Sequence, residues 1–286
     1  MTQEQINKFL DYLKRIKNRS DKTVANYKFY LERFSDWFNS SSVKKLEKIK
    51  EKQIVEYKEW LKKRKPRLSK ETRNYHLIAL RNMLKYLARN GTNCLYYNKI
   101  KLFKTKKKPI EIVEMSELAR FLESPLEVDS SKVIKARDKA VLEVLICTGL
   151  KVSELARLEI KGFLPKSGSL VGHSKLGKRK FALSNQAIHW VKEYLSARND
   201  SLPYLFISHD KGTSSRTINK KQKGLSPRSL ERIVKKYQQA AGISKTITPN
   251  LLRHYYAKRL IMKGEHIDLI KQKLGNVADN SIEQYK

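Results

Sequence analysis

The first hundred residues repeat apolar side chains at the period of amphipathic helices. The pattern predicts four helices, at about residues 3–17, 22–38, 52–63 and 70–89. Ser20 or Asp21, and Ser69, are N-cap candidates because a side-chain oxygen there can accept a free backbone N–H. No alternating strand pattern interrupts this stretch, so we expect a small helical domain.

The rest of the chain also reads as mainly helical. Helices are expected at residues 116–122, 131–149, 184–197 and 226–240, with a short one from Ser153 and another from Pro249. Residues 169–183 differ, because apolar positions alternate on both sides of a polar turn at 173–178. This alternation is typical of a hairpin. We therefore expect a mainly α protein with a small antiparallel sheet.

A lysine-rich segment separates the two parts. Residues 99–108 read KIKLFKTKKK and lead into Pro109. We interpret residues 101–108 as a basic linker, between a domain at 1–100 and a domain at 109–286. Such a linker suits a chain that tracks a DNA backbone, but a solvated hinge would have the same composition.

The net charge indicates a polyanionic partner. The chain carries 62 Lys and Arg against 28 Asp and Glu, a formal charge of +34. Both halves are basic, so the excess is not confined to one tail. Neutralising phosphates and releasing their counterions drives nucleic-acid binding. The alternative is a compositional bias toward lysine that serves solubility.

The sequence gives no sign of a cofactor, a metal or a membrane. Cys94 and Cys147 are far apart and match no metal spacing, and so small a cysteine content suits a reducing compartment. No apolar run approaches the length of a membrane span, and no signal peptide opens the chain. We expect a cytoplasmic protein.

The last forty residues carry the candidate chemistry. Thr248 is a good N-cap and Pro249 suits the first helical position, so a helix should begin here. Arg253 would lie one turn inside that helix, where its planar fork can bind two phosphate oxygens. Asn250 precedes Arg253 by three residues and should share its face. A lone tyrosine, Tyr285, follows near the end of the chain.

Five blocks, taken together and in order, resemble the tyrosine recombinase (phage integrase, Xer-like) family. They are the core-binding segment at 69–87, the box Thr-Gly-Leu-Lys-Val-Ser-Glu-Leu at 148–155, the lysine-rich turn of the hairpin, the helix at 226–243, and the closing run with Thr-Pro-Asn-Leu-Leu-Arg-His at 248–254, Leu-Gly-Asn at 274–276 and Tyr285. The resemblance covers nearly the whole chain. It implies a helical core-binding domain followed by an α+β catalytic domain.

The resemblance also implies a nucleophile. The family's tyrosine, here Tyr285, attacks a DNA phosphate, forms a 3′-phosphotyrosine and releases a 5′-hydroxyl. Neither a metal nor ATP is required, because the covalent link conserves the bond energy. A phenol has a pKa near 10, so nearby cations must favour its phenolate form. The alternative is that Tyr285 is one more packing residue among the 14 tyrosines.

The remaining site residues follow from the same resemblance, with three departures. Lys151 stands where the family has an arginine, so its charge is kept but the bidentate fork is lost. Lys175 takes the position of the lysine general acid, with Lys178 as the competing candidate. Asn250 and Asn276 stand where histidine is usual (at the second, often tryptophan), and an amide cannot relay a proton.

The implied function is site-specific recombination of duplex DNA by a homo-oligomer, a tetramer on two DNA sites. The three departures raise an alternative, a DNA-binding protein of the same fold with impaired catalysis. A relaxing topoisomerase that uses the same chemistry is a further possibility. Trapping of a covalent adduct on a nicked substrate would separate the first two.

Overall fold

The computed structural model describes residues 3–43, 45–105, 113–174, 177–209 and 224–275. The chain divides into two compact units, Met1–Lys108 and Pro109–Lys286. Each unit has its own hydrophobic core and is described by itself.

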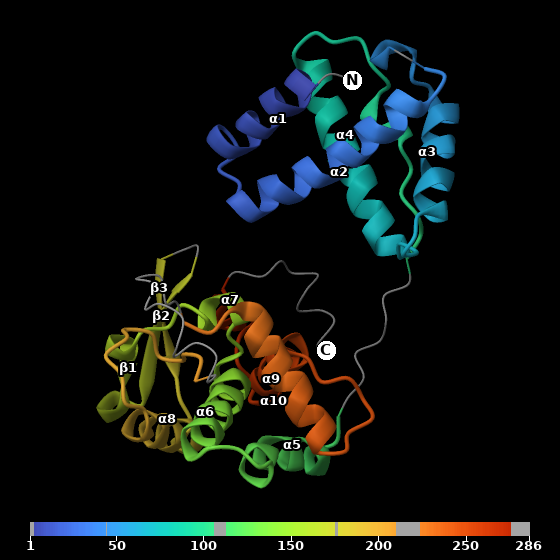
Figure 1. The fold of residues 1–286 in the computed structure, drawn as a ribbon. Helices are drawn as coiled ribbons and strands as arrows, with labels where there is room; N and C mark the ends of the chain where they lie inside the picture. Colours follow the sequence, from blue (N-terminus) through green and yellow to red (C-terminus); the bar gives the residue numbers. More distant parts are fainter. Residues whose placement is uncertain (1–2, 44, 106–112, 175–176, 210–223, 276–286) are drawn as a thin grey trace. The chain divides into compact units, whose positions relative to one another are not determined.

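The first unit contains the four predicted helices (Figure 1). They are α1 (Gln3–Arg15), α2 (Asp21–Ser40), α3 (Glu51–Lys63) and α4 (Lys70–Arg89), with short 3₁₀ turns at Leu46–Lys48 and Tyr97–Lys99. The two serine caps are confirmed: Ser20 Oγ accepts the N–H of Thr23 at 3.3 Å, and Ser69 Oγ accepts that of Thr72 at 3.1 Å. Helix α4 packs against each of the other three.

Part of the predicted linker packs on the first core. Leu102 and Phe103 lie against that core. Asn74 fixes the backbone of Phe103 through the nitrogen and the oxygen of its side-chain amide. Asn74 Nδ2 donates to the Phe103 carbonyl at 3.0 Å, and the Phe103 N–H donates to Asn74 Oδ1 at 2.8 Å. The partly buried Phe103 and its two hydrogen bonds to Asn74 therefore hold this beginning of the linker against the core.

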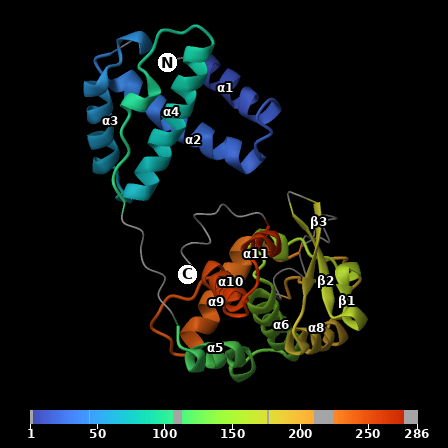
Figure 2. The same cartoon turned by 180° about the vertical axis from the view of Figure 1, so that it is seen from behind.

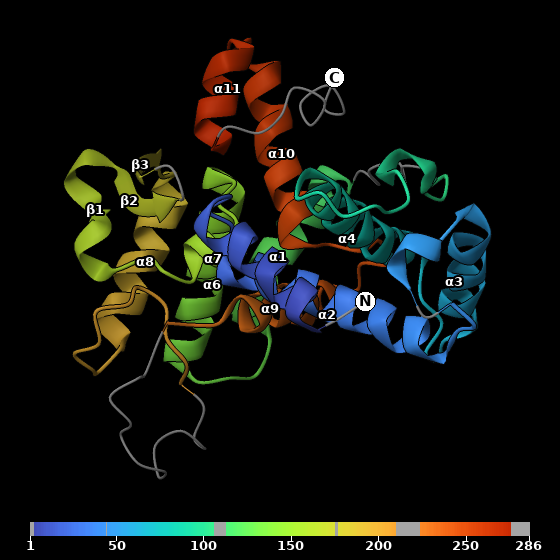
Figure 3. The ribbon, with the colours of Figure 1, turned by 90° about the horizontal axis from the view of Figure 1, so that it is seen from above.

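The second unit is helical with a small sheet at one side (Figure 2). Its helices are α5 (Met115–Glu127), α6 (Lys132–Thr148), α7 (Val152–Leu155), α8 (Asn185–Ala197), α9 (Pro227–Ala240), α10 (Pro249–Met262) and α11 (Ile267–Leu274). Helices α10 and α11 lie side by side (Figure 3). The helix expected at 116–122 is longer than predicted, because it continues through Pro125.

The sheet has three antiparallel strands in the order β1-β2-β3. Strands β2 (Ser169–Ser174) and β3 (Gly177–Ala182) form the predicted hairpin. Leu170 pairs with Phe181, and both side chains are buried. Strand β1 (Phe163–Leu164) is an addition, since two residues are too few to show an alternating pattern. The predicted fold class is confirmed.

Helix α6 is the centre of the second core, and α5, α8 and α10 pack around it. It is buried on almost every side, so polar residues of α6 are buried too. Lys139 is 1 % exposed and donates to Glu143 Oε1 at 2.9 Å and to Glu123 Oε1 at 2.8 Å. A buried ammonium is tolerated only when it is paired in this way.

Among the described residues, no helix is both long enough and apolar enough to cross a membrane.

We predict that Lys139→Ala destabilises the second unit by about 3–5 kcal/mol, because it leaves the buried Glu143 carboxylate without its cation. Urea unfolding followed by tryptophan fluorescence measures the change. Lys161→Ala is the matched control, since its pair with Glu159 is exposed and is worth at most about 1 kcal/mol. A loss of less than 1 kcal/mol for Lys139→Ala would contradict the prediction.

Candidate active site

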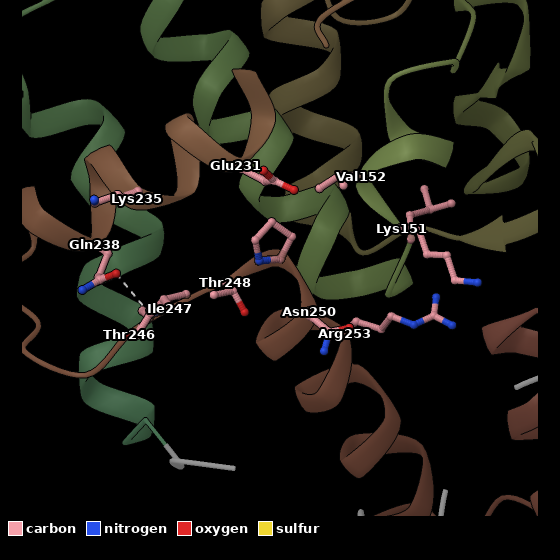
Figure 4. Close-up of a pocket in the computed structure, with 12 residues that line it drawn as sticks. Lys151, Val152, Glu231, Lys235, Gln238, Thr246, Ile247, Thr248, Asn250 and Arg253 are labelled. Carbon is pink, nitrogen blue, oxygen red and sulfur yellow. Dashed lines mark hydrogen bonds between the residues drawn. The ribbon is translucent and has the colours of Figure 1, made fainter. Parts of the chain in front are cut away.

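A pocket of about 560 Å³ lies where α7, α9 and the start of α10 meet (Figure 4). Three predicted site residues line it together, namely Lys151, Asn250 and Arg253. The full lining consists of Leu150, Lys151, Val152, Glu231, Lys235, Gln238, Thr246, Ile247, Thr248, Pro249, Asn250 and Arg253. Three cationic side chains therefore face the pocket against the single carboxylate of Glu231.

The start of α10 is built as the sequence predicts. Thr248 Oγ1 accepts the N–H of Leu251 at 3.1 Å, and Pro249 occupies the first helical position. The backbone N–H groups of a first helical turn, together with the helix dipole, favour an anion at this end. This part of the pocket wall is therefore suited to a phosphate group.

Arg253 is 5 % exposed, and two backbone carbonyls hold its guanidinium. Nη1 donates to the Gly149 carbonyl at 2.6 Å, and Nη2 donates to the Leu274 carbonyl. These carbonyls belong to the C-terminal ends of α6 and α11. Arg253 thus fastens three helices together at the pocket, which the sequence did not predict.

Gly149 makes the turn that lets α6 end beside α10. Its φ of 60° is left-handed, and a Cβ there would lie 2.5 Å from Cδ1 of Tyr256. A larger residue would be strained in its backbone and would overlap that ring. The glycine therefore allows Leu150 and Lys151 to reach the pocket.

Lys151 is exposed and immediately precedes α7. Its backbone N–H donates to Glu154 Oε2 at 3.0 Å, so the carboxylate fixes the position of the lysine's backbone. In Figure 4 the side chains of Lys151 and Arg253 extend toward the same region of the pocket. Two cations from segments distant in sequence thus converge, as a phosphate clamp requires.

Arg179 supports this arrangement from β3, and sequence reasoning missed it. Its Nη1 donates to Glu154 Oε1 at 3.2 Å, and its Nη2 donates to the Lys273 carbonyl. A Cβ on Gly275 would lie 2.6 Å from Arg179 Nη1, so the glycine leaves space for the guanidinium. The available signal was an arginine within a hairpin that otherwise uses lysine.

Lys235, Gln238 and Thr246 also line the pocket and were not among the predicted residues. Lys235 and Gln238 belong to α9, whose sequence match to the family gave no role for single side chains. They could have been found from their spacing of three residues, which places both side chains on one face of α9.

Asn250 contacts a histidine that the sequence analysis had not paired with it. The Asn250 Nδ2 and His254 Nε2 atoms are 2.9 Å apart. Burial, and then the positive charge of Arg253, lower the pKa of His254 below its usual range. The imidazole is therefore kept neutral and can accept the amide hydrogen.

Lys175, Asn276 and Tyr285 lie outside the described residues, and their roles stay predictions. Asn276 and Tyr285 follow α11 in sequence, and that helix ends at Leu274, whose carbonyl binds Arg253. Among the described residues, no cluster of His, Cys, Asp and Glu has a metal-binding arrangement.

Comparison with known proteins defines the class of this protein. Residues 111–286 match the model of the phage integrase family, and residues 6–91 match the phage integrase N-terminal SAM-like domain. The chain therefore belongs to the phage integrase family, the tyrosine recombinases. Members of this family are enzymes that transfer DNA strands.

Two relatives are similar to this chain in sequence, and one solved structure is similar to it in fold. The chain is 30% identical to the TnP I resolvase of Bacillus thuringiensis over 94% of this chain and 89% of that protein. It is 26% identical to the tyrosine recombinase XerD of Staphylococcus epidermidis RP62A over 98% of this chain and 92% of that protein. The lambda integrase tetramer bound to a Holliday junction has the same fold, with a TM-score of 0.68 and 16% identity over 96% of this chain and 77% of that one.

The lowered pKa of His254 predicts how stability depends on pH. Below the unfolded pKa of about 6.5, the unfolded chain binds a proton that the folded chain does not accept. The contribution of His254 to the free energy of unfolding should therefore be complete above that pH. It should decrease as the pH falls below about 6.5 toward the lower pKa of the folded state. Urea unfolding at several pH values measures this slope. His254→Gln should make the slope shallower, and an unchanged slope in this variant would contradict the assignment to His254.

Proposed function

We propose that this protein is a site-specific recombinase that cleaves and rejoins duplex DNA through a 3′-phosphotyrosine on Tyr285. Lys151 and Arg253 bind the scissile phosphate, and Lys175 protonates the leaving 5′-oxygen. Asn250 and Asn276 donate hydrogen bonds in place of the usual histidines. In the attack, the Tyr285 phenolate, whose proton is lost to solvent, forms the new bond to phosphorus while the bond to the 5′-oxygen breaks and that oxygen takes a proton from Lys175.

One observation carries the proposal: Lys151 and Arg253 line the same pocket at the start of α10. Two cations and a helix N-terminus can balance the charge that develops on a pentavalent phosphorus. The Arg253 guanidinium also binds the Leu274 carbonyl, directly before the segment that carries Asn276 and Tyr285. The sequence order therefore supports a nucleophile that reaches this pocket.

The neutral His254 supports a role for Asn250 as a donor. Because burial and Arg253 keep the imidazole unprotonated, Nε2 can accept one hydrogen of the Asn250 amide. The other hydrogen of the amide can then point toward the pocket. An amide held in this way stabilises negative charge but moves no proton.

Duplex DNA and a tetrameric assembly are proposed as the working partners. The net charge of +34 supports binding to a phosphate backbone. The structurally similar lambda integrase forms a tetramer on a Holliday junction. We propose that four copies of this chain bring two DNA sites together, without a metal or other cofactor.

A DNA-binding protein of the same fold with impaired catalysis is the second candidate. It is favoured by Lys151, Asn250 and Asn276, which stand where the family has more effective groups. Both candidates bind DNA, so a binding assay does not separate them. Formation of a covalent adduct does.

We predict that the wild-type chain forms a covalent adduct on a nicked suicide substrate and that Tyr285→Phe does not, because phenylalanine has no nucleophilic oxygen. A denaturing gel detects the adduct, and gel shift at low salt should show equal DNA binding by both proteins. Tyr96→Phe, at an exposed tyrosine of the first unit, is the control and should keep the adduct. Absence of an adduct from wild type would favour the impaired protein, and an adduct from Tyr285→Phe would exclude Tyr285. Plasmid relaxation without a defined site would instead favour a topoisomerase.

We predict that Lys151→Ala slows cleavage by up to about 10²–10³-fold, the cost of losing a donor to the developing charge. Lys151→Arg should equal or exceed wild type, because a guanidinium can bind two phosphate oxygens at once. Single-turnover cleavage of the nicked substrate at saturating protein measures both rates. A wild-type rate in Lys151→Ala would show that Lys151 is an ordinary surface lysine.

A further inference from the structure

A second cavity of about 380 Å³ lies in the catalytic unit, against a different face of α9. Lys235 and Gln238 of α9 line the candidate active site, whereas Arg232 and Lys236 line this second cavity. Its full lining is Ser130, Ile134, Arg137, Asp138, Ser208, Leu225, Ser229, Arg232, Ile233 and Lys236. The lining thus combines three cations and three hydroxyl groups with one carboxylate.

Arg137 is the innermost cation, and it is 6 % exposed. Its Nε donates to Asp138 Oδ1 at 2.7 Å, and its Nη1 donates to the Ile207 carbonyl at 3.2 Å. Its Nη2 makes no hydrogen bond within the described parts of the chain, and this atom is reachable by solvent. An otherwise buried guanidinium that is held in place by two hydrogen bonds and keeps an accessible donor on a cavity wall can bind an anionic acceptor.

The single carboxylate is already bonded on both of its oxygens. Asp138 Oδ1 accepts from Arg137, and Oδ2 accepts from the Tyr237 hydroxyl at 2.8 Å. Burial, followed by the charge of Asp138, raises the pKa of Tyr237, so its proton stays in that hydrogen bond. Asp138 therefore orients Arg137 and cancels part of its charge, while Arg232 and Lys236 keep the cavity positive.

Two helices begin at the cavity. Ser130 lies just before α6, and the N-cap of that helix, Ser131, makes no side-chain capping bond. Ser229 lies in the first turn of α9. Both helices are longer than three turns, so the positive ends of two helix dipoles add to the charge of the three cations. The Ser130 hydroxyl adds a neutral donor of the kind that phosphate oxygens accept. The Ser229 hydroxyl, by contrast, lies 2.9 Å from the Ser226 hydroxyl and is already hydrogen-bonded.

We propose that this cavity binds a phosphate group, and that α9 therefore separates two phosphate sites. The phosphate can come from the backbone of bound DNA or from a free phosphorylated molecule, since the recognising chemistry is the same. The first source rests on the proposed function. Phosphate binding itself does not, because it requires neither Tyr285 nor cleavage.

The first experiment titrates inorganic phosphate into the intact protein by calorimetry. Arg232→Ala/Lys236→Ala should weaken binding at least tenfold, because two of the three cations are lost. Both side chains are exposed, so the double variant should fold normally. Lys192→Ala removes one exposed charge from α8, outside both cavities, and is the control that should bind phosphate as wild type does.

The second experiment measures DNA affinity against salt for the same proteins. A backbone phosphate in the cavity predicts that the slope of log K against log salt becomes shallower by about 1 in the double variant. Loss of phosphate binding with an unchanged slope would assign the cavity to a free phosphorylated ligand. A shallower slope supports the DNA backbone whether or not free phosphate binds measurably.

A third variant tests the buried arginine. Arg137→Gln can keep a hydrogen bond to the Ile207 carbonyl while it removes the charge, and thermal unfolding checks that it folds. It should weaken phosphate binding at least as much as the double variant does. Two outcomes overturn the proposal, and in both of them wild type and the double variant have the same salt slope. In the first they also bind phosphate with the same affinity, and in the second neither binds phosphate. An adduct-negative wild type would defeat the catalytic proposal but leave these results intact.

Discussion

The arrangement of the second unit depends on two arginines that hold the end of α11. Arg253 binds the carbonyl of Leu274, and Arg179 binds the carbonyl of Lys273. The last carbonyls of a helix have no partners within the helix, so a guanidinium satisfies them well. Arg253 also binds Gly149, and Arg179 also binds Glu154, which holds Lys151. These contacts join strand β3 to the end of α6, the start of α7, and helices α10 and α11 at one place.

This arrangement gives Arg253 a dual position. Its guanidinium is almost fully buried, yet it lines the candidate active site. A desolvated cation is costly unless it is hydrogen-bonded, and the two carbonyls provide that compensation. They also fix the direction of the fork before any phosphate arrives. Such preorganisation is the usual source of electrostatic stabilisation in enzymes.

The same logic of helix ends applies across the unit. Cationic and hydroxyl side chains line one cavity where α10 begins, and others line a second cavity where α6 and α9 begin. Helix α9 has an apolar stripe that packs on the core, and polar faces on both sides of that stripe. Because helical residues three or four apart share a face, one helix can serve two cavities with different side chains. Some of the basic residues behind the net charge of +34 are thus placed around these two cavities.

Most of the helices, the hairpin and the start of α10 could be predicted from the sequence, because periodicity, serine and threonine caps, and Pro249 act over a few residues. The separate helix α11 and the full length of α5 were not predicted. The sequence also supplied the family, through motifs whose order is fixed along the chain. It could not show that Arg253 would bind carbonyls of Gly149 and Leu274, or that Arg179 would hold Glu154. These contacts join residues more than twenty positions apart, and local rules say nothing about such distances. Every lysine and arginine carries the same charge in the sequence. Only the tertiary structure shows which of these basic residues are buried and which are oriented by hydrogen bonds toward the candidate active site.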